Sequence, residues 1–239
     1  MNGKIMYTLL KKDIKSCLAN KNILVSVLIP IFFCALYRYL FSGIGEGMQG
    51  FVLNISAVFA ISIIPTSILP IMIAEEKEKY TLRSLMLAHV RGHEFLTSKI
   101  LVCLGMTAVV STAVFFIAGG DGQDYFAYLA AAMVSAAGLC FLGAMAGLLS
   151  KDQASAGTIS APLTLLTMLP PLFSGFNDVF ERISAVVPTT SFQTIYTAVQ
   201  SGQNILSGNS LTAIIVCAVW IAGGAVLFDV FYRRKGIDC

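Results

Sequence analysis

The chain has 239 residues, of which 56% are hydrophobic and only 12% are charged. Soluble domains carry about a quarter of charged residues, and the mean hydropathy of +0.80 is far above a soluble value. This composition excludes an ordinary soluble domain, and the net charge of +3 gives no reason to expect a nucleic-acid partner. We predict an all-α integral membrane protein, with a single membrane domain over residues 1–239.

Residues 1–21 form an arm ahead of the first long apolar run. Apolar residues from Ile5 to Leu18 recur at helical spacing on one face of this arm, and lysines occupy the opposite face. Asp13 interrupts the pattern because it falls on the apolar side. Such a helix typically lies flat in the cytoplasmic interface with its lysines toward anionic lipid. The alternative is a solvated basic arm that only sets the topology.

Six apolar runs follow, each with a length close to the roughly 20 residues that a helix needs to cross a bilayer. They are Asn22–Phe41, Phe51–Ala74, Ile100–Ala118, Tyr125–Leu149, Ala156–Phe173 and Ser210–Tyr232. None shows the period-two alternation of a lipid-facing barrel strand. The fifth run is short and is interrupted by Pro162, Pro170 and Pro171. We therefore predict six transmembrane helices.

The basic residues are concentrated on one side of this predicted topology. Fourteen of the 16 lysines and arginines fall in the arm, in the connections after the second and fourth spans, and in the tail. The positive-inside rule then places both termini in the cytoplasm, and an even number of spans requires both termini on one side. We expect a multi-pass protein of the plasma membrane.

Small residues crowd the fourth predicted span, where Gly143 and Gly147 form a G-x-x-x-G pair. Such pairs allow helix backbones to approach closely in lipid. The sequence leaves open whether this packing occurs within one chain or between two chains.

The connection over 175–209 is long and nearly free of charge. One apolar group in it consists of Phe192, Ile195, Tyr196 and Val199. Long uncharged loops are unusual in water. Two short helices that dip back into the outer leaflet would explain this composition, and a pair of helices packed on the outer surface is the alternative.

Motifs for enzymatic chemistry are missing from the chain. It has no G-x-x-x-x-G-K-[ST] phosphate-binding loop. His89 and His93 have helical i, i+4 spacing but no third ligand nearby, and the six cysteines include no C-x-x-C. We expect no catalytic residue, no metal site and no cofactor bound by this chain, and we expect the cysteines to be packing residues.

The charged segment over 75–99 separates the second and third spans. After Glu75 it reads Glu76-Lys77-Glu78-Lys79-Tyr80-Thr81-Leu82, continues through Leu85-Met86-Leu87, and ends with Glu94-Phe95-Leu96 and Lys99. Charges this dense are costly in lipid, so the segment must reach water. With the six spans, the amphipathic arm and the apolar outer loop, it resembles the permeases of the ATP-binding cassette (ABC) type-2 family.

This resemblance implies that the segment is a cytoplasmic coupling helix that docks on a separate ATP-binding subunit. The residues that match the family pattern are Glu76, Glu78, Thr81, Leu82, Glu94 and Lys99. We expect coupling through Glu76, Glu78, Thr81 and Leu82, with Leu85 as part of an apolar group beside the charges. The segment departs from the family pattern at Tyr80, where glycine is usual, and at His89, where proline is usual. The family's outer loop forms re-entrant helices.

The implied function is the permease subunit of an ABC exporter that moves a lipophilic or amphipathic substrate, such as a drug or antimicrobial compound. Its partners would be ATP-binding subunits in two copies, which carry ATP and Mg²⁺, a second permease chain and membrane lipid. Two alternatives stay open, an intramembrane hydrolase and an ion-coupled carrier. A hydrolase would need a set of acid, histidine or serine residues within the spans, and a carrier would work without an ATPase.

Overall fold

The computed structural model describes residues 3–43, 47–81, 92–176, 178–203 and 208–235, which hold helices and no strand. The long helices are α1 (Gly3–Ala19), α2 (Lys21–Phe41), α3 (Gly47–Ile63), α4 (Leu69–Glu78), α6 (Gly92–Ala118), α7 (Tyr125–Leu149), α8 (Gln153–Phe173), α10 (Pro188–Gln200) and α11 (Gly208–Lys235). The short ones are η1 (Ile64–Ile68), η2 (Gly122–Asp124), η3 (Ser174–Phe176) and α9 (Asp178–Ser184).

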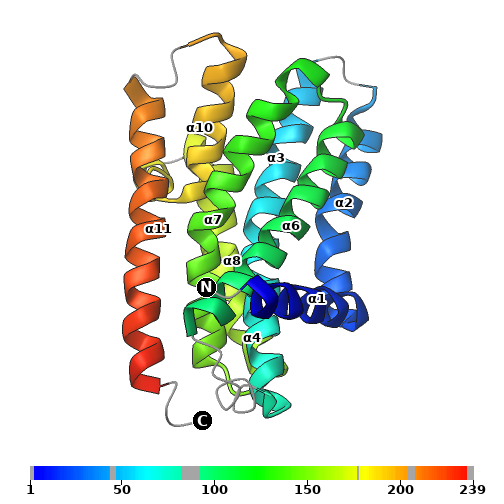
Figure 1. Ribbon diagram of the computed structural model, residues 1–239. Helices are drawn as coiled ribbons and strands as arrows, with labels where there is room; N and C mark the ends of the chain where they lie inside the picture. The colour runs from blue at the N-terminus through cyan, green and yellow to red at the C-terminus, as the bar shows by residue number, and fades with distance from the viewer. Residues whose placement is uncertain (1–2, 44–46, 82–91, 177, 204–207, 236–239) are drawn as a thin grey trace.

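Within these residues, six helices are long and apolar enough to cross a membrane. They are Lys21–Phe41, Met48–Glu78, Gly92–Ala118, Gly122–Leu149, Gln153–Phe176 and Gly208–Phe228. The predicted all-α fold with six spans is therefore confirmed. The spans run side by side as an antiparallel bundle, and the ends of α1 and α11 lie at the same end of it (Figure 1).

The spans differ from their predicted bounds mainly at charged ends. The second continues past Ala74 to Glu78, and the third begins at Gly92, because the charged residues there stay helical and are paired by neighbouring helices. The fifth begins at Gln153, where the Asp152 carboxylate caps the helix by accepting a hydrogen bond from the Ser155 amide. Residues 82–91, the middle of the predicted coupling helix, lie outside the described residues.

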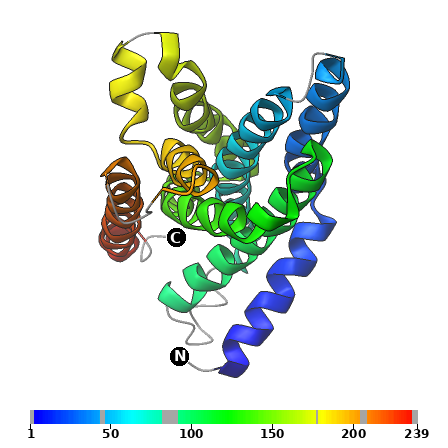
Figure 2. The same ribbon diagram turned by 90° about the horizontal axis from the view of Figure 1, so that it is seen from above.

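Helix α1 lies across the lower end of the bundle, along one outer edge (Figures 1 and 2). Its amphipathic pattern explains this position, since Met6, Leu9 and Cys17 are buried while Lys11 and Lys15 are exposed. The Asn20 side chain caps α2, so the chain turns sharply from the arm into the first span.

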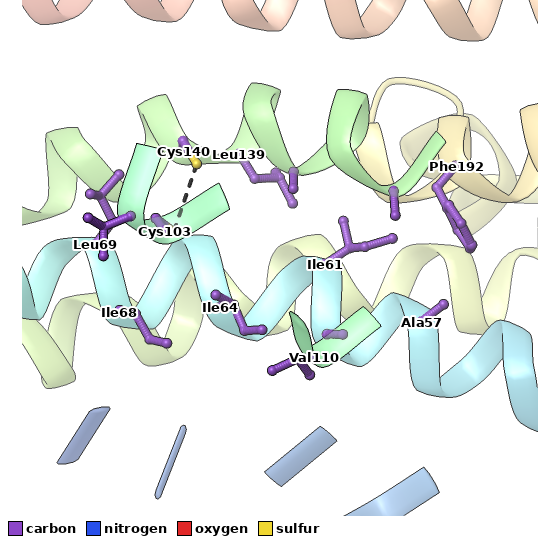
Figure 3. Close-up of a cluster of buried hydrophobic side chains, with 14 of the residues drawn as sticks. Ala57, Ile61, Ile64, Ile68, Leu69, Cys103, Val110, Leu139, Cys140 and Phe192 are labelled. Carbon is purple, nitrogen blue, oxygen red and sulfur yellow. Dashed lines mark hydrogen bonds between the residues drawn. The ribbon is translucent and has the colours of Figure 1, made fainter. Parts of the chain in front are cut away.

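The second span is the most buried of the six. It contains a π-helical segment, η1, around Pro65. Proline has no amide hydrogen and its ring crowds the preceding turn, which a local π-segment relieves. The core around it draws on α6, α7 and α10, as Figure 3 shows with Ile61, Ile64, Ile68, Leu69, Cys103, Val110, Leu139, Cys140 and Phe192.

The two glycines of the G-x-x-x-G pair in α7, Gly143 and Gly147, pack within this chain. A Cβ atom at Gly143 would collide with the Pro65 carbonyl oxygen, and one at Gly147 would lie 2.8 Å from Ile73 Cβ. Both glycines therefore pack against the second span within this chain. They allow α7 to approach the carbonyl of the π-segment directly.

Candidate functional site

The last turn of α4 carries two glutamates that are almost completely buried. Glu75 and Glu76 are each 6% exposed. A buried carboxylate is tolerated only when it is paired and hydrogen-bonded. Three partners from other helices belong to the same site, and we call the set of Lys12, Asp13, Glu75, Glu76 and Lys99 the ionic hub.

Lys99 is the centre of the ionic hub. Its side chain is 2% exposed, and its Nζ lies 3.1 Å from Asp13 Oδ1 and 3.3 Å from Glu76 Oε1. The second Asp13 oxygen accepts a hydrogen bond of 2.5 Å from the Ser98 hydroxyl. One lysine of α6 thus joins a carboxylate of α1 to a carboxylate of α4.

The Glu76 carboxylate has two further partners. The Lys12 ammonium donates to both of its oxygens, at 2.6 and 2.7 Å. The Thr81 hydroxyl donates to Glu76 Oε2 from just beyond the end of α4. Both carboxylate oxygens of Glu76 are therefore hydrogen-bonded to side chains of the same chain.

Glu75 binds the other end of the arm. Its carboxylate accepts hydrogen bonds from the Ser16 hydroxyl at 2.9 Å and from the Asn20 amide at 3.1 Å. Lys79, one turn further along the chain, also pairs with Glu75, and this hydrogen bond raises the pKa of Lys79. Arm and second span are joined along the whole C-terminal half of α1.

The next two charged residues reach the connection between α7 and α8. Lys77 Nζ donates to the carbonyls of Leu148 at 2.8 Å and Ser150 at 2.5 Å, which satisfies the free C-terminal end of α7. Glu78 Oε2 accepts from both nitrogens of Gln153 at the start of α8, at 3.1 and 3.2 Å. Four consecutive residues, 75–78, therefore connect the arm and the spans α6, α7 and α8 at one end of the bundle.

The predicted coupling residues that the structure describes differ in how far they are exposed. Glu76 is buried, Thr81 is bonded to it, and Glu78 is exposed beside Gln153. Leu82 and Leu85 lie outside the described residues. Of the three described residues, Glu78 is the most exposed. The coupling role of all five residues stays a prediction.

Tyr80 lies two residues beyond the end of α4 and has a left-handed conformation with φ of 54°. Glycine adopts this conformation without strain, whereas other residues pay roughly 1–2 kcal/mol. The chain therefore turns left-handed after α4 at a non-glycine residue.

Sequence reasoning missed Asp13. In the sequence this residue only interrupts the apolar face of the arm, whereas in the structure Asp13 is buried at 3% exposure and belongs to the ionic hub. An acid within an apolar helical face is itself a signal of a buried basic partner. Its partner could not be identified from the sequence, because Lys99 is far away along the chain.

At the opposite end, the connection over 175–209 forms the two short helices α9 and α10. In α10, Phe192, Ile195 and Tyr196 are buried and Val199 is partly buried. Tyr128 of α7 contacts the rings of Phe192 and Tyr196, each at a centroid distance of 5.5 Å. Helix α10 thus packs beside α7 and α11 within the bundle (Figure 1).

Helix α9 is different, because its apolar side chains are exposed. Val179 is 61% exposed and Ile183 is 47% exposed. The connection back to the bundle is fixed by Trp220 of α11, whose indole nitrogen donates to the Val186 carbonyl at 2.7 Å.

The described residues contain no group of three or more His, Cys, Asp and Glu side chains that could hold a metal ion. The five described cysteines are buried and unbridged, and Cys103 contacts Cys140 with a sulfur–sulfur distance of 3.9 Å (Figure 3). Burial raises the pKa of the Cys17 thiol to about 12. His93 is exposed, and His89 lies outside the described residues.

Six apolar spans, four of which are joined at one end by charged side chains, define a polytopic α-helical membrane protein. The sequence profile of the family described as "ABC-2 family transporter protein" matches residues 38–227, and the chain belongs to this family. It is thus an ABC transporter permease, of a kind that works with ATP-binding subunits. A comparison with curated proteins finds no match.

Proposed function

We propose that this chain is the permease subunit of an ABC exporter that moves a lipophilic or amphipathic substrate across the plasma membrane. Two copies of a separate ATP-binding subunit hold ATP and Mg²⁺, and a second permease chain completes the transporter. The observation that carries the proposal is the connection of residues 75–78 to the arm and to α6, α7 and α8. A push on this end of α4 is transmitted to all of them together.

The end of the bundle that holds the ionic hub faces the cytoplasm in this proposal. It carries most of the basic residues of the sequence, as the positive-inside rule requires of the cytoplasmic side. Lys11 and Lys15 of the arm then lie at the level of the lipid headgroups. Both termini are cytoplasmic.

Helix α10 lies in the outer leaflet in this proposal. Its packing between α7 and α11 (Figure 1) supports this position, as does the absence of charged residues from Pro188 to Gln200. The exposed apolar side chains of α9, including Phe180 and Ile183, also favour contact with lipid. A hydrophobic substrate would leave the bundle beside these two helices.

The exposed part of the docking surface is expected in the residues that follow Glu78. The acidic residues before it are engaged by Lys12, Lys79 and Lys99. Apolar anchors commonly dominate such contacts, and truncating one costs about 2 kcal/mol or more. Leu82 matches the family pattern and Leu85 begins the apolar group Leu85–Leu87, so both are the expected apolar anchors.

Co-purification tests the proposal. A tagged chain is isolated from its native membrane in mild detergent, and the bound proteins are probed for a subunit that photolabels with an ATP analogue. We expect Leu82→Ala and Leu85→Ala each to reduce retention of this subunit about 30-fold, the equivalent of 2 kcal/mol.

The matched control is Leu166→Ala, because Leu166 lies on α8 with 64% of its side chain exposed, away from the hub end. It should retain the ATP-binding subunit as wild type does. Absence of any ATP-binding partner, or equal retention in all three variants, would contradict the proposal.

A further inference from the structure

An apolar groove of about 500 Å³ opens on the outside of the bundle between α1, α2 and α6. Helix α1 contributes Leu10, Ile14 and Leu18, and α6 contributes Leu101, Gly105 and Val109. Every side chain that lines the groove is apolar or, at Cys17, weakly polar. The groove is not part of the ionic hub, and the proposed function makes no use of it.

The shape of α1 explains why this groove exists. The helix has two apolar strips, and the one that contains Met6, Leu9 and Cys17 is buried. The second strip, Leu10, Ile14 and Leu18, repeats every four residues and faces the groove, where Leu18 keeps 62% of its surface exposed. A flat interface helix thus forms the lower edge of an open apolar surface.

The groove extends from α1 along the spans. Leu101 and Val109 are eight residues apart on one helix, which corresponds to a rise of about 12 Å. An occupant would therefore begin at the level of the arm and run parallel to α6 into the hydrocarbon. A lipid acyl chain has this direction and this chemistry.

Two lysines beside the groove favour a lipid with a negatively charged headgroup. Lys11 and Lys15 follow Leu10 and Ile14 in sequence, and both are exposed on α1. The one acidic residue of this helix, Asp13, is turned to the other side and is held by Lys99 and Ser98. The edge of the groove is therefore positive, which favours a negatively charged headgroup.

We propose that this groove binds one anionic phospholipid of the surrounding bilayer, with an acyl chain along α6 and the phosphate between Lys11 and Lys15. This inference does not depend on the direction of transport or on the ATP-binding subunit. It assigns a specific lipid site to the arm, whose ordinary role would be a general attachment to the membrane surface.

Gly105 provides a direct test, because a Cβ atom there meets nothing within 4 Å. Gly105→Leu should place a side chain in the groove, because Gly105 lines it and the Cβ position is open. The matched control is Gly223→Leu on α11, where a Cβ atom also meets nothing and no part of the groove is near. Both variants are purified in mild detergent, compared with wild type by gel filtration, and titrated with phosphatidylglycerol or phosphatidylcholine under native mass spectrometry.

We expect wild type and Gly223→Leu to bind one phosphatidylglycerol in preference to phosphatidylcholine, and Gly105→Leu to bind it at least tenfold more weakly. The double variant Lys11→Gln, Lys15→Gln should lose the preference for the anionic lipid, by about fivefold per lysine. Equal binding by Gly105→Leu, or no headgroup preference in wild type, would overturn the proposal. Loss of a dimer in Gly105→Leu with unchanged lipid binding would show instead that the groove is an interface between two copies.

Discussion

Lys99→Met tests whether the ionic hub holds the arm to the spans. Lys99 is 2% exposed, and its ammonium is the nearest basic group to Asp13 and one of two that pair with Glu76. Among the described side chains, Asp13 then keeps the Ser98 hydroxyl, whereas Glu76 keeps Lys12 and Thr81. A buried carboxylate without a counter-charge should make the variant much less stable.

The expected loss of stability in Lys99→Met follows from the burial of the charges that remain. Removing one partner of a buried ion pair costs about 3–5 kcal/mol, because the remaining charge is left uncompensated. The matched control is Lys12→Met, since the Lys12 side chain is 41% exposed and its loss leaves Glu76 paired with Lys99. That variant should lose at most about 1 kcal/mol.

The assay is equilibrium unfolding of the purified chain in mixed micelles, with Asp13→Asn added to complete a double-mutant cycle. We expect the double variant Asp13→Asn, Lys99→Met to be more stable than the sum of the two single losses predicts, with a coupling of about 0.5–3 kcal/mol. Equal stability of Lys99→Met and Lys12→Met, or strict additivity in the cycle, would refute the reasoning.

Three further predictions concern single positions. Gly143→Ala should lose about 1–3 kcal/mol in the same assay, because its Cβ would meet the Pro65 carbonyl, whereas Gly105→Ala, in open space, should not be destabilised. Tyr80→Gly should gain about 1 kcal/mol by relieving the left-handed backbone, and an unchanged stability would count against that strain. Cys17 should resist alkylation at pH 8, because a pKa raised to about 12 keeps the thiol protonated. An engineered Lys11→Cys, at an exposed position on the polar side of the same helix, should react, and equal rates would contradict the buried position.

The sequence predicted the features that depend on local pattern. The length of the apolar runs determined the six spans, and the helical spacing of Leu9, Leu10 and Cys17 predicted the amphipathic arm. The uncharged outer connection predicted two short helices, which are present as α9 and α10. Their position relative to a bilayer stays a prediction.

The features that sequence reasoning could not determine depend on contacts between distant segments. Asp13 and Lys99 come together only because α1 packs against α6. The position of one charged residue in a sequence does not identify the residue with which it pairs. Glu75 and Glu76 were placed outside the second span because unpaired charge is costly there, yet the helix continues through them since their partners neutralise them. Likewise, the partner of Gly143 could only be found in three dimensions.

The most direct test of the account compares two energy sources in one membrane. Inverted vesicles that contain this chain with its co-purified ATP-binding subunit are loaded by adding a lipophilic fluorescent dye outside, and dye uptake is followed after addition of ATP and Mg²⁺ or of an ion gradient. The account predicts uptake with ATP only, no uptake by the chain alone, and no ATP hydrolysis by the chain alone. Robust uptake by the chain alone under an ion gradient would contradict it and would establish an ion-coupled carrier.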